Sequence, residues 1–155
     1  PLPRTSNTIK VDITLSEKLT FQLEDRFVLT SYIEFDDLPE DASIKAYSLK
    51  EIATEKVVAI LDRRRSEPRD IYDFWYLTRS QYVDCLDLVP AIEEKLTFRG
   101  LKLVDEAKNF DSGKEAKYRK AWKQRLEQQM SQLPEFESVN RAVQREFRRV
   151  HILGN

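Results

Sequence analysis

The sequence predicts an α+β fold, in which a partial mixed sheet is followed by a mostly helical C-terminal bundle. Two periodicities support this class. Residues 8–15 alternate apolar and polar side chains, with the period of two that is typical of a strand. From residue 48 onward, apolar side chains recur every three or four positions, which is the period of an amphipathic helix. We therefore expect a strand-rich region at residues 1–47 and a helical region at residues 48–155.

The first expected element is a strand over Thr8–Leu15, TIKVDITL, which places Asp12 on its polar face. Because aspartate is depleted in strands, this position indicates either solvent exposure, the more frequent explanation, or a carboxylate that projects toward a ligand. Residues 21–38 carry a mixed signal with one or two further strands. The residues from Pro39 to Asp41 predict a turn, and residues 43–47 predict a short strand.

Helix signals begin at Ser48, which forms a capping-box pattern with Glu51, three residues later. Ser66, followed closely by Pro68, indicates the start of a second helix. Further helices are expected at residues 87–99, ended by Gly100, at residues 102–109, and in two long segments on either side of Pro134. The regularly spaced aromatic residues of these two segments are expected in the core.

The net charge of −1 conceals an asymmetry along the chain. Residues 1–112 carry 16 basic and 22 acidic side chains, whereas residues 113–155 carry 10 basic and 5 acidic ones, so the two parts sum to −6 and +5. A basic segment suits contact with nucleic acid, although solvated helix faces are the commoner explanation. The candidate RNA-binding residues lie on one face of the last helix and are Arg141, Arg145, Arg148 and Arg149.

Several functional classes are excluded by composition. One cysteine and one histidine exclude an intrachain disulfide and a Cys/His metal site, so carboxylates would have to hold any metal. All three glycines lie at position 100 or beyond, which excludes a glycine-rich phosphate loop before the first helix. No apolar run reaches the roughly 18 residues of a membrane span, and no signal peptide is evident, so we expect a cytoplasmic protein without a membrane partner.

One lysine lies in the apolar stripe of the first expected helix. Lys56 falls on the arc that also holds Leu49 and Ile52. Its ammonium therefore either reaches back to water along its own stem or faces a cleft that holds phosphate. In the second helix, Asp70 and Asp73 share one face. From spacing alone, they serve either the helix dipole and an i,i+4 pair with Arg69, or a site.

Taken together, the strand IKVDIT, the helix EIATEKVVAILDR and the helix RDIYDFWYL resemble the nucleotidyltransferase family of AbiEii/AbiGii abortive-infection toxins. The resemblance covers roughly residues 8–155 and is most specific over residues 8–77. It implies a nucleotidyltransferase-like fold and Mg²⁺-dependent transfer of NMP from an NTP. GTP is one candidate donor, and the acceptor is RNA, such as tRNA, or protein. It also implies a toxin of a toxin–antitoxin or phage-defence system, with a cognate antitoxin as partner.

The resemblance also implies roles for individual residues. Asp12 matches a metal-binding carboxylate, and Lys56 matches the family lysine, a point charge on the triphosphate. Arg69, Asp70 and Asp73 match the family's RDxxD motif. The catalytic set implied is therefore Asp12, Lys56, Asp70 and Asp73, with Lys56 and Arg69 binding the nucleotide.

The sequence departs from the family pattern at its beginning. It opens at Pro1 and contains neither the Gly-Ser motif nor the Asp-x-Asp pair that begin the family pattern. We therefore expect the C-terminal portion of a longer enzyme, inactive by itself because two metal-binding carboxylates are missing. The alternative is a non-catalytic helical module that binds RNA or an antitoxin partner.

Overall fold

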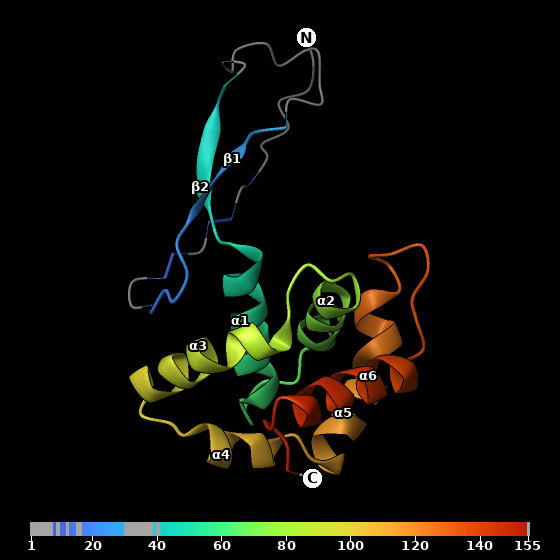
Figure 1. Cartoon of the computed structure of the whole chain (residues 1–155). Coiled ribbons are helices and arrows are strands. Elements are labelled where there is room, and N and C mark those ends of the chain that lie inside the picture. Colours follow the sequence, from blue (N-terminus) through green and yellow to red (C-terminus); the bar gives the residue numbers. More distant parts are fainter. Residues whose placement is uncertain are drawn as a thin grey trace.

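The structure is a computed structural model that describes residues 8, 10–11, 13–14, 17–29, 39 and 41–154. A small sheet precedes a helical body, so the predicted α+β class is confirmed (Figure 1). No helix in these ranges has the length and apolar composition that crossing a bilayer requires. The elements in chain order are β1 (Glu24–Phe27), β2 (Ser43–Ala46), α1 (Leu49–Leu61), α2 (Pro68–Arg79), α3 (Cys85–Phe98), α4 (Leu103–Glu106), the 3₁₀ helix η1 (Ala107–Asn109), α5 (Ser112–Leu126) and α6 (Phe136–Arg149).

The sheet is a two-stranded arm. β1 and β2 pair antiparallel, with Glu24 opposite Ala46 and Phe27 opposite Ser43. Figure 1 shows the pair extending away from the helices, and Phe27 is 74% exposed. The expected short strand at residues 43–47 and a strand within residues 21–38 are therefore present. Among the described residues the sheet contains only this antiparallel pair, whereas a mixed sheet was expected.

The structure differs from prediction at the N-terminal strand. The described residues of the range 8–15 lie outside any strand, and Val11 and Ile13 are 73% and 78% exposed. A period of two determines which side chains could share a face, but a strand forms only where a neighbouring strand completes its hydrogen bonds. No strand in the described part of the chain pairs with this segment. Asp12 lies outside the described residues.

Helix starts follow the capping signals with small shifts. The Ser48 hydroxyl accepts a hydrogen bond from the Glu51 N–H at 3.1 Å, which confirms the predicted cap of α1. The Glu51 carboxylate does not complete the capping box, because it contacts residues 20, 21 and 95 instead. α2 begins at Pro68 rather than at Ser66, since proline is well placed in the first helical position. α3 begins two residues before the expected start, at Cys85.

α1 lies at the centre of the helical body, with α2 on one side and α3 on the other, and α2 in turn packs against α5 and α6 (Figure 1). The expected aromatic core is confirmed, because Tyr118, Trp122 and Phe147 are at most 2% exposed. Trp122 donates its indole N–H to the Pro134 carbonyl at 2.9 Å, so its polar atom is satisfied in the core. This packing places α1 and α2 side by side.

Candidate functional site

Lys56, in the middle of α1, contacts two aspartates of α2. Its ammonium Nζ lies 3.1 Å from Asp70 Oδ1 and 2.7 Å from Asp73 Oδ2. The side chain of Lys56 is 21% exposed, and that of Asp70 is only 4% exposed. The lysine in the apolar stripe therefore finds carboxylates at the boundary of the core rather than extending into water. Burying Asp70 without a cation would cost several kcal/mol, so this contact also fixes α1 against α2.

Two arginines complete the cluster. Arg65 Nη2 lies 3.2 Å from Asp70 Oδ2, and Arg69 Nε lies 3.6 Å from Asp73 Oδ2. Each aspartate therefore bridges Lys56 to one arginine. We call Lys56, Arg65, Arg69, Asp70 and Asp73 the Lys56 cluster. Its three cations and two carboxylates leave a formal charge of +1 on the protein surface, which favours an anionic ligand.

A groove runs beside this cluster along α1. It consists of a cavity of about 450 Å³ and an adjoining cavity of about 290 Å³, which share four lining residues. Together they have the size of an ordinary ligand site. We call this the α1 groove. Its charged lining consists of five cations, Lys18, Lys56, Arg65, Lys95 and Arg99, and three carboxylates, Glu17, Glu55 and Asp70.

A second ionic cluster is buried at the other end of the α1 groove. The Lys95 ammonium lies 2.6 Å from Glu51 Oε1 and also donates to Glu55 and to the Lys18 carbonyl. Lys95 is 1% exposed and Glu51 is fully buried. We call Glu51, Glu55 and Lys95 the Lys95 cluster. It joins α1 to α3.

The charges of the Lys95 cluster are mutually stabilised. Burial alone raises the pKa of Glu51, but hydrogen bonds from Lys95, Phe21 and Thr20 lower it below its ordinary value. Burial alone lowers the pKa of Lys95, but its hydrogen bonds to Glu51 and Glu55 raise it overall. Both groups are therefore charged at neutral pH, and they tie the segment at residues 18–21 to the helical body.

The carboxylates near Lys95 do not fit a divalent metal. Glu17, Glu51 and Glu55 bring carboxylate oxygens within 4.8 Å of one another. A divalent cation would need those oxygens as ligands, but the Lys95 ammonium already bonds to Glu51 and Glu55. Lys95 therefore occupies the cation position itself. The metal ligand predicted from sequence, Asp12, lies outside the described residues.

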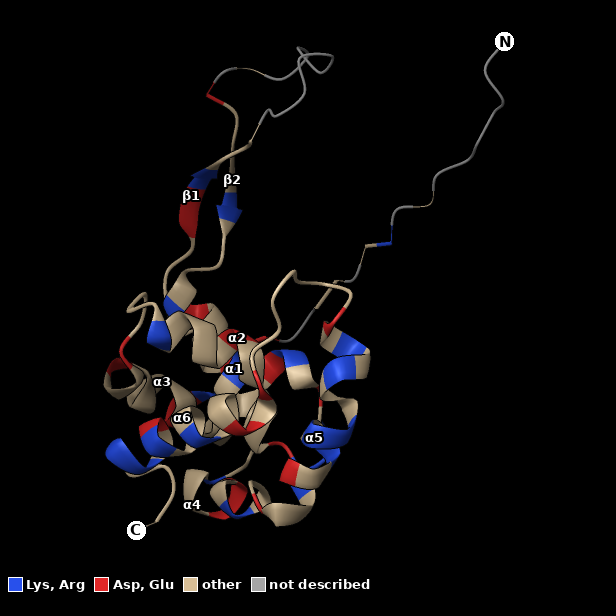
Figure 2. Ribbon diagram, turned by 90° about the vertical axis from the view of Figure 1, so that its right-hand side faces the viewer, with Lys and Arg blue, Asp and Glu red and all other residues tan. Residues whose placement is uncertain are grey.

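The structure separates the four arginines predicted for RNA. Arg141 and Arg145 line a different groove, between α2 and α6. Arg148 donates to Gln144 at 3.2 Å and lines a cavity near the C-terminus. Arg149 is held by Asp84 at 2.6 Å and Glu146 at 2.9 Å, which raise its pKa. Figure 2 shows the positions of Lys and Arg on the ribbon, in blue, along α5 and toward the end of α6.

Sequence reasoning did not find every member of the site. Arg65 belongs to a run of three arginines, but spacing does not show which of them reaches Asp70. Glu55 and Lys95 are 40 residues apart and meet only because α1 crosses α3. The run of arginines was the one sequence signal for Arg65. No sequence signal indicated the pairing of Glu55 with Lys95.

Comparison with protein families identifies one match. The model of the family described as nucleotidyl transferase AbiEii toxin, type IV TA system, matches residues 2–147. The match includes both aspartates and the lysine of the Lys56 cluster, and it confirms the family resemblance found in the sequence. No curated protein and no solved structure matches the chain.

Proposed function

The chain belongs to the nucleotidyl transferase AbiEii toxin family, and from that premise we propose that its α1 groove takes part in transferring a nucleoside monophosphate from an NTP to an acceptor. A toxin of this type has a nucleotide substrate and an antitoxin partner. The finer proposal is that RNA, such as tRNA, or a protein accepts the NMP, with GTP as one candidate donor.

The observation that carries the proposal is the position of Lys56. Its ammonium lines a cavity of about 450 Å³ and is held by two aspartates, at 3.1 and 2.7 Å. A lysine fixed in this way presents a point charge of defined position, which suits a triphosphate whose negative charge grows on the leaving pyrophosphate. We assign Lys56 to the triphosphate and Asp70 and Asp73 to positioning Lys56. Arg69 supplies further positive charge beside the nucleotide.

Mg²⁺ enters the proposal through Asp12, the ligand predicted from sequence. A magnesium ion bound by protein carboxylates and substrate phosphates neutralises the triphosphate when it is present. The Lys95 cluster does not supply the other carboxylates, for the reason given above. The role assigned to the described residues is therefore electrostatic and positional, and it requires no metal contact from them.

The test is transfer of label from each of the four α-labelled NTPs to total RNA and to protein, by the toxin as its gene encodes it. Lys56→Arg keeps the charge that Asp70 requires but changes the position of the cation. We expect it to lower labelling by about 10²-fold or more, the scale of a lost electrostatic contact in a transition state, with an unchanged melting temperature.

Lys50→Arg is the matched control, because Lys50 lies on the same helix and pairs with Asp87 outside the groove. It should label like the unmodified toxin. Equal labelling by Lys56→Arg and Lys50→Arg would contradict the role of Lys56. Binding of RNA without labelling from any NTP would favour the non-catalytic helical module instead.

A further inference from the structure

A second groove separates α2 from α6. Its volume of about 650 Å³ exceeds that of either cavity of the α1 groove, and we call it the α2–α6 groove. We propose that this groove binds single-stranded RNA, with phosphates on its arginines and a base on the stack formed by Trp75 and Arg79. Its lining comes from both helices and consists of Trp75, Thr78, Arg79, Ser138, Arg141, Ala142, Arg145 and Glu146.

Among the residues that the structure describes, the arginines of this groove lack carboxylate partners. Within the described ranges, Arg79, Arg141 and Arg145 make no ion pair, whereas Arg119 and Arg149 are bound to carboxylates at 2.6 Å. The one acidic residue of the lining, Glu146, is itself held by Arg149 at 2.9 Å.

Arg141 and Arg145 are also four residues apart on one helix, where like charges repel each other. The C-terminal end of α2 favours a cation at Arg79, but this does not account for the pair on α6. A polyanion would neutralise all three arginines at once.

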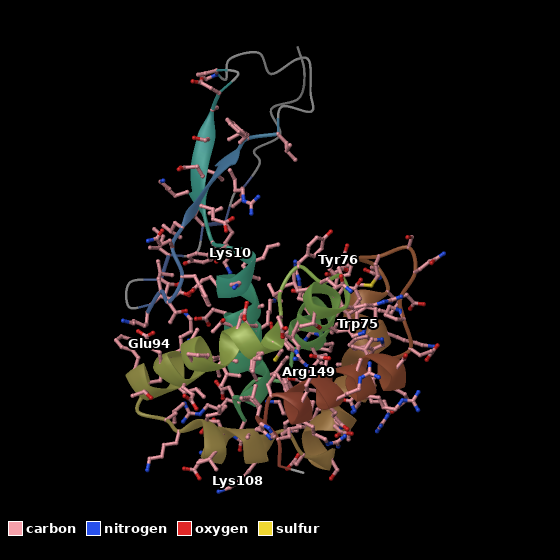
Figure 3. All side chains as sticks on the ribbon, viewed as in Figure 1. Lys10, Trp75, Tyr76, Glu94, Lys108 and Arg149 are labelled. Carbon is pink, nitrogen blue, oxygen red and sulfur yellow. The ribbon has the colours of Figure 1, made fainter. Side chains whose placement is uncertain are left out.

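The groove also offers an aromatic surface. The Arg79 guanidinium lies 5.0 Å from the ring centroid of Trp75, which is half-buried. Tyr76, the next residue on α2, lies outside the lining of the groove but is 46% exposed, and its ring lies 6.2 Å from that of Tyr82. Figure 3 shows Trp75 and Tyr76 where α2 neighbours the C-terminal helices. Aromatic rings and guanidinium planes are the surfaces on which unpaired bases stack.

This combination favours a single strand over other polyanions. A duplex keeps its base faces inside, so it would leave the Trp75–Arg79 stack unused. An acidic protein segment needs cations but has no bases to place on the indole. A single strand uses both features, because its bases and its phosphates are accessible together.

The place of the groove links it to the reaction, and this step rests on the proposed function. α2 carries Asp70 and Asp73 of the Lys56 cluster near its first turn and Arg79 at its last residue. Asp73 and Arg79 are therefore separated by about 9 Å along the helix axis. Since α2 lines both grooves, an RNA held in the α2–α6 groove would lie near the α1 groove, as an acceptor must.

Binding can be tested without any NTP. The probe is a fluorescein-labelled 20-nucleotide RNA of mixed, unstructured sequence, titrated with this chain over a range of salt concentrations. For Arg141→Glu/Arg145→Glu we expect a Kd at least 10-fold higher and a salt slope smaller by about 1.4, since each single-strand phosphate contact contributes about 0.7. Trp75→Leu should raise the Kd about 5-fold or more without changing the salt slope.

The charge-matched control is Lys102→Glu/Lys108→Glu, because both residues are exposed and neither lines the α2–α6 groove. It should change the Kd less than 3-fold. Equal losses of RNA affinity in the two double variants, or full affinity in Arg141→Glu/Arg145→Glu, would contradict the proposal that the α2–α6 groove binds RNA. A poly-glutamate peptide is titrated as a competitor. If it displaces the RNA and binds Trp75→Leu as tightly as the unmodified chain, the groove would be assigned to an acidic protein instead.

The experiments distinguish a failure of the RNA-binding groove from a failure of the proposed transferase function. RNA binding through this groove, with no NMP transfer by the toxin as its gene encodes it, would refute the transferase role of the α1 groove and leave this inference standing. Transfer to RNA that is unaffected by Arg141→Glu/Arg145→Glu would refute the groove as the acceptor site while leaving the transferase role intact.

Discussion

The two grooves use the same cationic residue types in opposite ways. In the α1 groove, each of the five lining cations lies within 3.3 Å of a carboxylate. In the α2–α6 groove, none of the three lining arginines has such a partner within the described residues. A paired cation is fixed in position, as Lys56 is beside Asp70 and Asp73, whereas an unpaired cation can still move toward a ligand. The comparison therefore separates cations that the fold already holds in position from cations that a ligand would have to order.

The largest expected effect comes from removing a paired cation in the core. Lys95→Met keeps most of the side-chain volume but leaves the fully buried Glu51 without its ammonium. An uncompensated buried charge costs about 3–5 kcal/mol, so we expect the free energy of unfolding to fall by that amount. Urea denaturation measures it.

Two further variants test whether the missing charge is the cause. Lys95→Met/Glu51→Gln should recover most of the loss, because it removes the orphaned carboxylate as well. Lys50→Met, which breaks an exposed pair with Asp87, should cost at most about 1 kcal/mol. A loss below about 1 kcal/mol in Lys95→Met would contradict the claim that this paired cation stabilises the fold.

A second buried lysine sharpens the comparison, because within the described residues it has a carbonyl partner and no carboxylate ion pair. Lys114 is 4% exposed and donates to the Asp62 carbonyl at 2.6 Å. Burial lowers its pKa to about 8, from an ordinary value of 10.5. Between pH 8 and 10.5 the unfolded chain therefore binds more protons than the folded chain, so this group makes stability rise with pH across that window.

Lys114→Met should abolish that rise, which amounts to at most about 3 kcal/mol. The measurement is urea denaturation at pH 7.5 and at pH 10, with the exposed Lys120→Met as control for the general effect of alkaline pH. If Lys114→Met and Lys120→Met show the same change between the two pH values, burial without a carboxylate does not distinguish Lys114 from a surface lysine.

The smallest expected effect lies in the α2–α6 groove. Arg141→Ala and Arg145→Ala should each change the free energy of unfolding by less than about 0.5 kcal/mol, because neither arginine forms an ion pair with a described residue. Arg149→Ala, which loses contacts with Asp84 and Glu146, should destabilise the chain more. Thermal unfolding of the three variants in one buffer ranks them. A marked loss in Arg141→Ala would mean that this arginine supports the fold rather than a ligand.

Much of the fold was predictable because its signals are local. The Ser48 cap and the predicted turn at Pro39 depend on residues within a few positions of one another, and both are present. The strand at residues 8–15 was not predictable in the same way. Its period of two is local, but the hydrogen bonds that make a strand come from a distant partner.

The same distinction between local signals and distant contacts applies to the site. By itself, the sequence determined the helical scaffold, the odd placement of Lys56 in an apolar stripe, and the shared face of Asp70 and Asp73, because helix geometry follows from spacing. Only the tertiary structure decided that Lys56 contacts both aspartates, that Lys95 bonds to Glu51 and Glu55, and that the four C-terminal arginines lie in different surroundings. Those outcomes depend on how helices cross, and crossing is set by the packing of many core side chains at once.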